Sequence, residues 1–147
     1  MTGVQTWLFR SLFGAVCPGS GGVVPRISTA GGVPSAAAGN PSFSIVLSRA
    51  RPSAIAVLIL GDSNTSWLGL PLPINLGFLG MPACSLSVAH GAAVVTATTA
   101  GGIEFIPAPV PQSAGLIGLT LYFQWYVVDP GPAAFPGAMT QGLAVTL

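Results

Sequence analysis

Short runs in which apolar and polar residues alternate, each ended by Gly or Pro, recur along almost the whole chain. In residues 42–48, for example, Phe43, Ile45 and Leu47 fall on one face of an extended segment and serines fall on the other. Because the side chains of a strand point alternately to opposite faces, this period of two predicts half-buried β-strands. No window shows a convincing 3.6-residue period, so we expect an all-β protein.

Six further segments show strand character. The longest, residues 119–128, places Trp125 on one face with its apolar neighbours and Tyr122 and Tyr126 on the other. Residues 54–60 form a continuous apolar run, which is typical of a central strand covered on both faces. The remaining segments are 84–90, 93–98, 103–106 and 143–147.

Turn-forming residues separate these segments, as in Asp129-Pro130-Gly131. Strands at intervals of roughly ten residues, about 7–9 in all, predict an antiparallel β-sandwich of jelly-roll or immunoglobulin-like type. We find no internal repeat and no domain boundary after residue 12. The sequence therefore predicts a single β-sandwich domain over residues 12–147.

Residues 1–11 differ from the rest of the chain. They resemble the translated sequence of a short-read sequencing adapter, with a frame shift that gives the segment from Thr6 to Ser11. We therefore expect this segment to be non-native, as in a metagenomic fragment, and a native amphipathic start is the alternative. Because the segment stands where a signal peptide would lie, the lack of a signal peptide there carries no information on export.

Charge is scarce in this sequence. The chain of 147 residues has four Arg, no Lys and three carboxylates, a formal net charge of +1 and 5% charged residues, against roughly 25% in typical soluble proteins. This composition provides no basic surface for nucleic acid. The mean hydropathy is +0.77, but Gly and Pro interrupt the apolar runs before they reach the ~20 residues of a spanning helix. We expect two-sided burial in sheets and no membrane span.

Cys17 and Cys84 are the two cysteines of the chain. In a cytosolic protein they would be two buried thiols, whereas in an exported protein they can form a disulfide. On the chain-entropy model, closing a loop of this length would stabilise the fold by about 4 kcal/mol. Neither cysteine has a second Cys or a His at metal-ligand spacing, so no metal site is predicted.

One motif suggests catalysis. The segment Ile59 to Thr65 (ILGDSNT) is similar to the nucleophile block of GDSL (SGNH) esterases, in which a Ser follows a strand. Ser63 would need a general base, yet the Asp-x-x-His of those enzymes is missing, and the single His, His90, lies in mid-chain. We favour a turn in which Asp62, Ser63 and Asn64 bond their own backbone.

Aromatic residues suggest a second possibility. Trp67, Tyr122, Trp125 and Tyr126 could stack against sugar rings, although aromatic residues in strands more often belong to the core, as we expect for Trp125. Trp67 lies in a turn-like segment and is the better candidate for an exposed contact. Tyr122 and Tyr126 are the further candidate ligand contacts.

The remaining polar residues have ordinary explanations. His90 ends an alternating segment beside Gly91 and is expected at a turn or on the surface. Glu104 has no second carboxylate close in sequence, so no glycosidase pair is predicted. Arg49 and Arg51 flank a strand end and are expected to be solvated and to guard a sheet edge against aggregation.

Several stretches together resemble a small C-terminal domain of secreted multidomain proteins of planctomycetes and myxobacteria, a family of unknown function. The resemblance extends over nearly all of residues 14–147, although each motif alone is weak. The matching stretches are CPGS at 17–20, LGxS at 60–63, LPLPINL at 70–76, GMPAC at 80–84, IP at 106–107, LYFQW at 121–125, DP at 129–130 and TQGL at 140–143.

This resemblance implies an exported β-sandwich with an early Cys paired to a mid-domain Cys, here Cys17 and Cys84. The family usually has Asp where Asn75 stands, so no metal site is carried over to this chain. We expect a non-catalytic accessory module that packs, anchors or associates at the cell surface, without cofactors. Its partners would be other domains of the same chain or cell-surface components. A carbohydrate-binding module is the alternative, and an esterase fragment comes third.

Overall fold

The structure is a computed structural model that describes residues 10–19, 22–79, 81–128 and 137–147, and these residues form an all-β protein. They contain thirteen strands and short 3-10 turns. The strands are β1 Arg10–Phe13, β2 Arg26–Ala30, β3 Ser44–Ser48, β4 Ile55–Gly61, β5 Ser66–Trp67, β6 Leu70–Pro71, β7 Ile74–Leu76, β8 Met81–Leu86, β9 Ala92–Ala97, β10 Glu104–Pro107, β11 Thr120–Val127, β12 Ala138–Met139 and β13 Gly142–Thr146.

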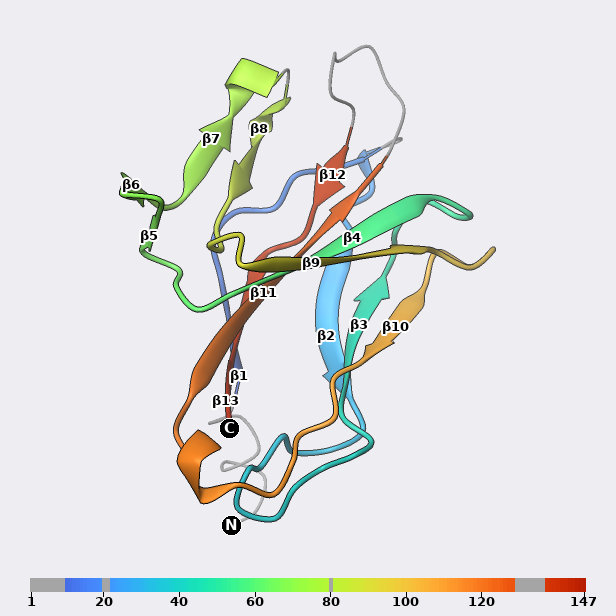
Figure 1. The fold of residues 1–147 in the computed structure, drawn as a ribbon. Helices are drawn as coiled ribbons and strands as arrows, with labels where there is room; N and C mark the ends of the chain where they lie inside the picture. The colour runs from blue at the N-terminus through green and yellow to red at the C-terminus, as the bar shows by residue number, and fades with distance from the viewer. Residues whose placement is uncertain (1–9, 20–21, 80, 129–136) are drawn as a thin grey trace.

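Two antiparallel sheets form the two layers of the sandwich (Figure 1). The main sheet has the strand order β1-β13-β11-β4-β9, and β12 pairs with one end of β11. The second sheet has the order β10-β3-β2. The prediction of an all-β sandwich is therefore confirmed.

The space between the two sheets holds an apolar core, which we call the inter-sheet core. Its largest member, Trp125 on β11, has no exposed surface. Alternate residues of β3, β4 and β11 point into this space, as the period of two predicts. Its buried members are Ile27, Ala36, Phe43, Ile45, Leu47, Ala54, Ala56, Leu58, Val110, Phe123, Trp125, Val127, Leu143 and Val145.

The other face of the main sheet is covered by an excursion of the chain between β4 and β9. Strands β5 and β6 form one hairpin and β7 and β8 form a second, with a 3-10 turn, η2 Gly77–Leu79, between β7 and β8. We call residues 66–86 the flap. Its buried side chains and those of the main sheet form a second group, the flap cluster, with Cys17, Ile59, Leu76, Cys84, Leu86, Val88 and Met139 as buried members.

On each open side of the sandwich a side-chain hydrogen bond joins the two layers. On one side the Nη1 of Arg10 on β1 donates to the Oγ1 of Thr29 on β2 at 2.6 Å. On the other, the Oγ1 of Thr96 on β9 donates to the carboxylate of Glu104 on β10. These two hydrogen bonds join the edge strands of the two sheets, β1 to β2 and β9 to β10.

The predicted segments correspond to observed strands, with shifted ends. The segment predicted at 84–90 is a strand only as far as Leu86, because the chain then leaves β8 towards β9. The short strands β5, β6 and β7, like β2, follow no clear alternation and were not predicted. The predicted boundary after residue 11 falls inside β1, and the turn at residues 129–131 lies outside the described residues.

The expectation that Arg49 and Arg51 are solvated is confirmed, since both are exposed. They follow β3, which is the central strand of the second sheet, so neither lies on an edge strand. Arg49 adopts a positive φ of 55° in the connection between β3 and β4. Together with Arg51 it lines a small cavity at that end of the sandwich.

Candidate functional site

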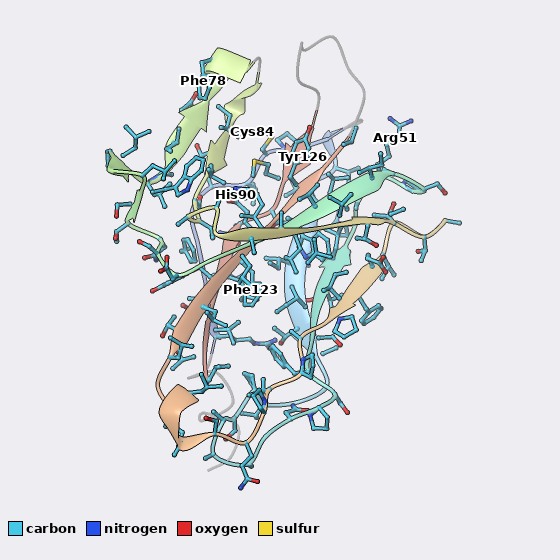
Figure 2. The ribbon with its side chains drawn as sticks, in the orientation of Figure 1. Arg51, Phe78, Cys84, His90, Phe123 and Tyr126 are labelled. Carbon is cyan, nitrogen blue, oxygen red and sulfur yellow. A yellow bond between two sulfur atoms is a disulfide. The ribbon has the colours of Figure 1, made fainter. Side chains whose placement is uncertain are left out.

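The disulfide between Cys17 and Cys84 is present and ties the N-terminal segment to the flap. The two Cα atoms are 4.9 Å apart, within the usual range for a disulfide. Backbone hydrogen bonds between Cys17 and Met139 of β12 hold the first cysteine against the main sheet. The bridge therefore fastens β8 to that sheet, and Figure 2 shows Cys84 at this junction.

A buried glutamine makes a second fastening beside the disulfide. The side chain of Gln124 on β11 has no exposed surface, and its Oε1 accepts from the backbone N–H of Ser87 at 2.9 Å. Its Nε2 donates to the carbonyl oxygens of Ser85 at 3.0 Å and Thr140 at 2.9 Å. Gln124 thereby joins the backbone at the end of β8, which pairs with β7, to β11 of the main sheet. In the sequence, the one sign of this role is that Gln124 is the single amide side chain in the predicted strand 119–128.

Large apolar side chains are exposed along the flap. Leu68 is 82% exposed, Phe78 75% and Leu70 53%. In Figure 2, Phe78 lies at the tip of the β7–β8 hairpin. Residues 63–89 contain no Asp, Glu, Lys or Arg. The flap therefore combines exposed large apolar side chains with a complete lack of charged residues.

The turn between β5 and β6 is built in an unusual way. Leu68 has a φ of 52° and Gly69 a φ of 80°, so both residues of a two-residue hairpin loop lie in the left-handed region. This turn type strongly prefers Asn-Gly or Asp-Gly, and a branched apolar residue in its first position is strained. Among the described residues, the most exposed large apolar side chain, that of Leu68, therefore lies on a strained turn.

The predicted ligand-contact aromatics pack against the flap cluster. Trp67 is half-buried and meets His90 edge to face, with ring centroids 6.0 Å apart. Tyr122 meets Phe13 in the same way at 5.9 Å. The ring of Tyr126 lies so close to the backbone at Gly137 that a Cβ there would overlap it. Burial raises the pKa of the Tyr126 hydroxyl above its ordinary value.

These three aromatic residues therefore pack, partly buried, around the edge of the flap cluster. Their faces are partly used by neighbours within the protein, which reduces the ring area open to a sugar. The carbohydrate-binding alternative stays a prediction, with a glycan array and a Trp67→Ala control as its test. The prediction that Trp125 belongs to the core is confirmed by its complete burial.

The Gly-Asp-Ser segment forms a turn stabilised by its own serine. The Oγ of Ser63 accepts from the backbone N–H groups of Thr65 at 3.1 Å and Ser66 at 3.2 Å. The carbonyl of Ser63 accepts from the N–H of Ala89 at 2.9 Å, which brings His90 into the same region. Among the described residues, however, no hydrogen bond joins the imidazole of His90 to the Ser63 hydroxyl. The imidazole contacts Trp67 instead.

No grouping of metal ligands marks a further site in the described part of the chain. Three or more His, Cys, Asp or Glu side chains that could hold an ion do not come together there. The Oδ1 of Asn75 accepts from the backbone N–H of Gly77 at 2.7 Å. Asn75 therefore shapes the turn into η2.

Two cavities lie on the open side between β1 and β2. One, of about 300 Å³, is lined by Arg10, Leu12 and Ile27 among others. The other, of about 490 Å³, extends towards Arg26 and Gln141. They lie on the far side of the main sheet from the aromatic residues of the flap cluster, so the two regions do not form one site.

Comparisons with known proteins add no assignment. No family model, curated protein or solved structure matches this chain. In the described ranges no helix has the length and apolar character needed to cross a bilayer. The structure thus defines an all-β sandwich protein with a disulfide-fastened apolar flap.

Proposed function

We propose that this protein is a non-catalytic accessory module of an exported multidomain protein, and that its flap packs against a neighbouring domain of the same chain. The observation that carries the proposal is Leu68, an 82% exposed leucine held at a positive φ. Asn or Gly would relieve the strain of this turn, so leucine costs stability in the isolated domain. Such strain is a known mark of functional positions.

The chemistry of the flap favours a protein surface as its partner. Phe78 and Leu70 are also exposed, and no charged residue occurs between positions 63 and 89. Removing such a surface from water is favourable, with a free energy of about 25 cal/mol for each Å² of apolar area that is covered. A second apolar protein surface provides that cover and needs no charged partner.

The disulfide supports export. Disulfides persist in oxidising compartments and are rare in the cytosol. The resemblance of residues 14–147 to C-terminal domains of secreted multidomain proteins points in the same direction. In such a protein the neighbouring domain is always present at high effective concentration, so a modest apolar flap suffices for stable packing.

The test uses the complete open reading frame, expressed with its own leader. We expect a leader for export and at least one further extracellular domain. Hydrogen exchange at residues 66–86 should be slower in the full chain than in the 147-residue protein. A frame that encodes neither a leader nor another domain, or equal exchange in both proteins, would overturn the proposal.

A single substitution separates docking from folding. Leu68→Asn should stabilise the isolated protein by about 0.5–1 kcal/mol because Asn tolerates a positive φ. In the full chain the same change should speed exchange at the flap. Ile117→Ser is the matched control, because Ile117 is 56% exposed but lies outside the flap. It should leave flap exchange unchanged.

A further inference from the structure

The four edge strands of the two sheets differ in how they are protected. The edge strand β1 carries Arg10, β2 carries Arg26, and β10 carries Glu104 and Pro107. Strand β9, Ala92–Ala97, is the longest of the four and has neither a charged residue nor a proline. Charges and prolines on edge strands keep sheets from pairing with other chains. Strand β9 lacks this protection.

The outward backbone groups of β9 follow from its pairing. The N–H of Thr98 donates to the carbonyl of Ala54, and Ala56, Leu58 and Leu60 continue that ladder opposite the even-numbered residues of β9. In an antiparallel strand, consecutive residues direct their hydrogen-bonding groups to opposite sides. The N–H and C=O groups of Ala93, Val95 and Ala97 therefore point away from the sheet.

The side chains leave this edge open to an approaching strand. Five of the six residues of β9 are exposed, and Val95 is 69% exposed. The one partly covered residue, Thr96, shares the inner face with Ala56 and donates to the carboxylate of Glu104. That carboxylate is therefore held between the layers, on the face opposite Val95.

We propose that β9 pairs antiparallel with β9 of a second copy of this chain, with a two-fold axis at Val95. In this register Val95 faces Val95 of the other copy, and Ala93 faces Ala97, so each pair exchanges both of its backbone hydrogen bonds. The two main sheets become one continuous sheet across the axis.

The lack of charge on β9 favours a second copy of this chain as the partner of this edge. Like charges that face each other across two strands are destabilising, and identical strands related by a two-fold axis bring like residues together. Strand β9 has no charge to repel its own copy, and the whole chain has a net charge of only +1. Self-association is therefore free of the repulsion that protects the other edges.

This surface is separate from the flap, and the inference does not depend on the flap packing against another domain. Strand β9 lies at the edge of the main sheet, whereas the exposed residues of the flap lie on the excursion between β4 and β9 (Figure 1). Either surface can fail its test while the other passes.

The test measures the oligomeric state of the 147-residue protein by sedimentation velocity over a range of concentrations. We expect a reversible monomer–dimer equilibrium. Val95→Lys should abolish the dimer because it places two lysines opposite each other at the axis. Leu12→Lys is the matched control, since Leu12 is 54% exposed on the edge strand β1. It should leave the dimer intact.

Mixing two variants tests the register. Val95→Lys and Val95→Glu should each be monomeric, and an equimolar mixture should restore a dimer, because the two-fold axis pairs the lysine with the glutamate. Circular dichroism checks that both variants keep the fold. A wild-type protein that is monomeric at all concentrations, a dimer that survives Val95→Lys, or folded variants whose mixture stays monomeric would each overturn the proposal.

Discussion

The two faces of the main sheet are stabilised in different ways. The inter-sheet core on one face consists of alternate apolar residues from regularly paired strands, with Trp125 at full burial. The flap cluster on the other face lies under short hairpins and depends on the Cys17–Cys84 disulfide and on Gln124. One sheet therefore combines a self-sufficient core on one face with a layer that needs specific fastenings on the other. In the described part of the chain, that fastened layer carries the two most exposed large apolar side chains, Leu68 and Phe78.

The largest expected effect lies in the inter-sheet core. Trp125→Ala should lower the free energy of unfolding by up to about 5 kcal/mol, because the change leaves a cavity among fully packed neighbours. Denaturant unfolding measures the loss. Ile117→Ala on the exposed surface is the control and should stay within about 0.5 kcal/mol of the wild type. A loss for Trp125→Ala as small as the control's would contradict the assignment of this core.

Loss of the disulfide should lower the free energy of unfolding nearly as much as Trp125→Ala. Replacing Cys17 and Cys84 together with Ala removes a cross-link between residues 67 positions apart, and should cost about 4 kcal/mol on the chain-entropy model. Denaturant unfolding of the double variant, compared with the oxidised and reduced wild type, measures this cost. A double variant as stable as the oxidised protein would show that the bridge does not fasten the flap.

Loss of the Gln124 side-chain hydrogen bonds should cause the third-largest loss of stability. Gln124→Met keeps the volume but leaves the N–H of Ser87 and the carbonyls of Ser85 and Thr140 without this partner. We expect a loss of about 3 kcal/mol, the cost of unsatisfied buried polar groups. Ser87→Ala is the control, since the buried Oγ of Ser87 makes no hydrogen bond among the described residues. If both variants lose the same stability, Gln124 has no special role.

The smallest effect concerns pH. Burial raises the pKa of Tyr126 above its ordinary value of 10.0. The stability that this shift contributes is fully present below pH 10 and is lost as the pH rises through the folded-state pKa, because the unfolded chain releases the proton first. Tyr126→Phe should flatten this alkaline decline in thermal unfolding. An unchanged decline would mean that Tyr126 is not its source.

Sequence patterning was sufficient for the inter-sheet core and insufficient for the flap. Alternation at Phe43, Ile45 and Leu47 correctly placed β3, since regular strands bury every second residue. The two-residue strands β5 and β6 are too short to show a period, and the role of Gln124 depends on where distant loop carbonyls lie. The cysteine pair was the one part of the flap cluster that sequence reasoning identified as a link.

The contact residues were harder to predict than the fold. Trp67 was expected as an exposed contact, but it is half-buried against His90. Leu68, its neighbour, is the more exposed residue, and it adopts a positive φ that no periodicity reveals. Local backbone geometry, which depends on the hairpin register, decides which of two adjacent apolar residues faces solvent.

Native-state hydrogen exchange of the oxidised and the reduced protein tests directly whether the two layers are stabilised independently. After reduction, amides of β7 and β8 should lose protection, while amides of β3, β4 and β11 should stay protected. Equal loss of protection in both groups would contradict independent stabilisation, because the two layers would then unfold as one unit.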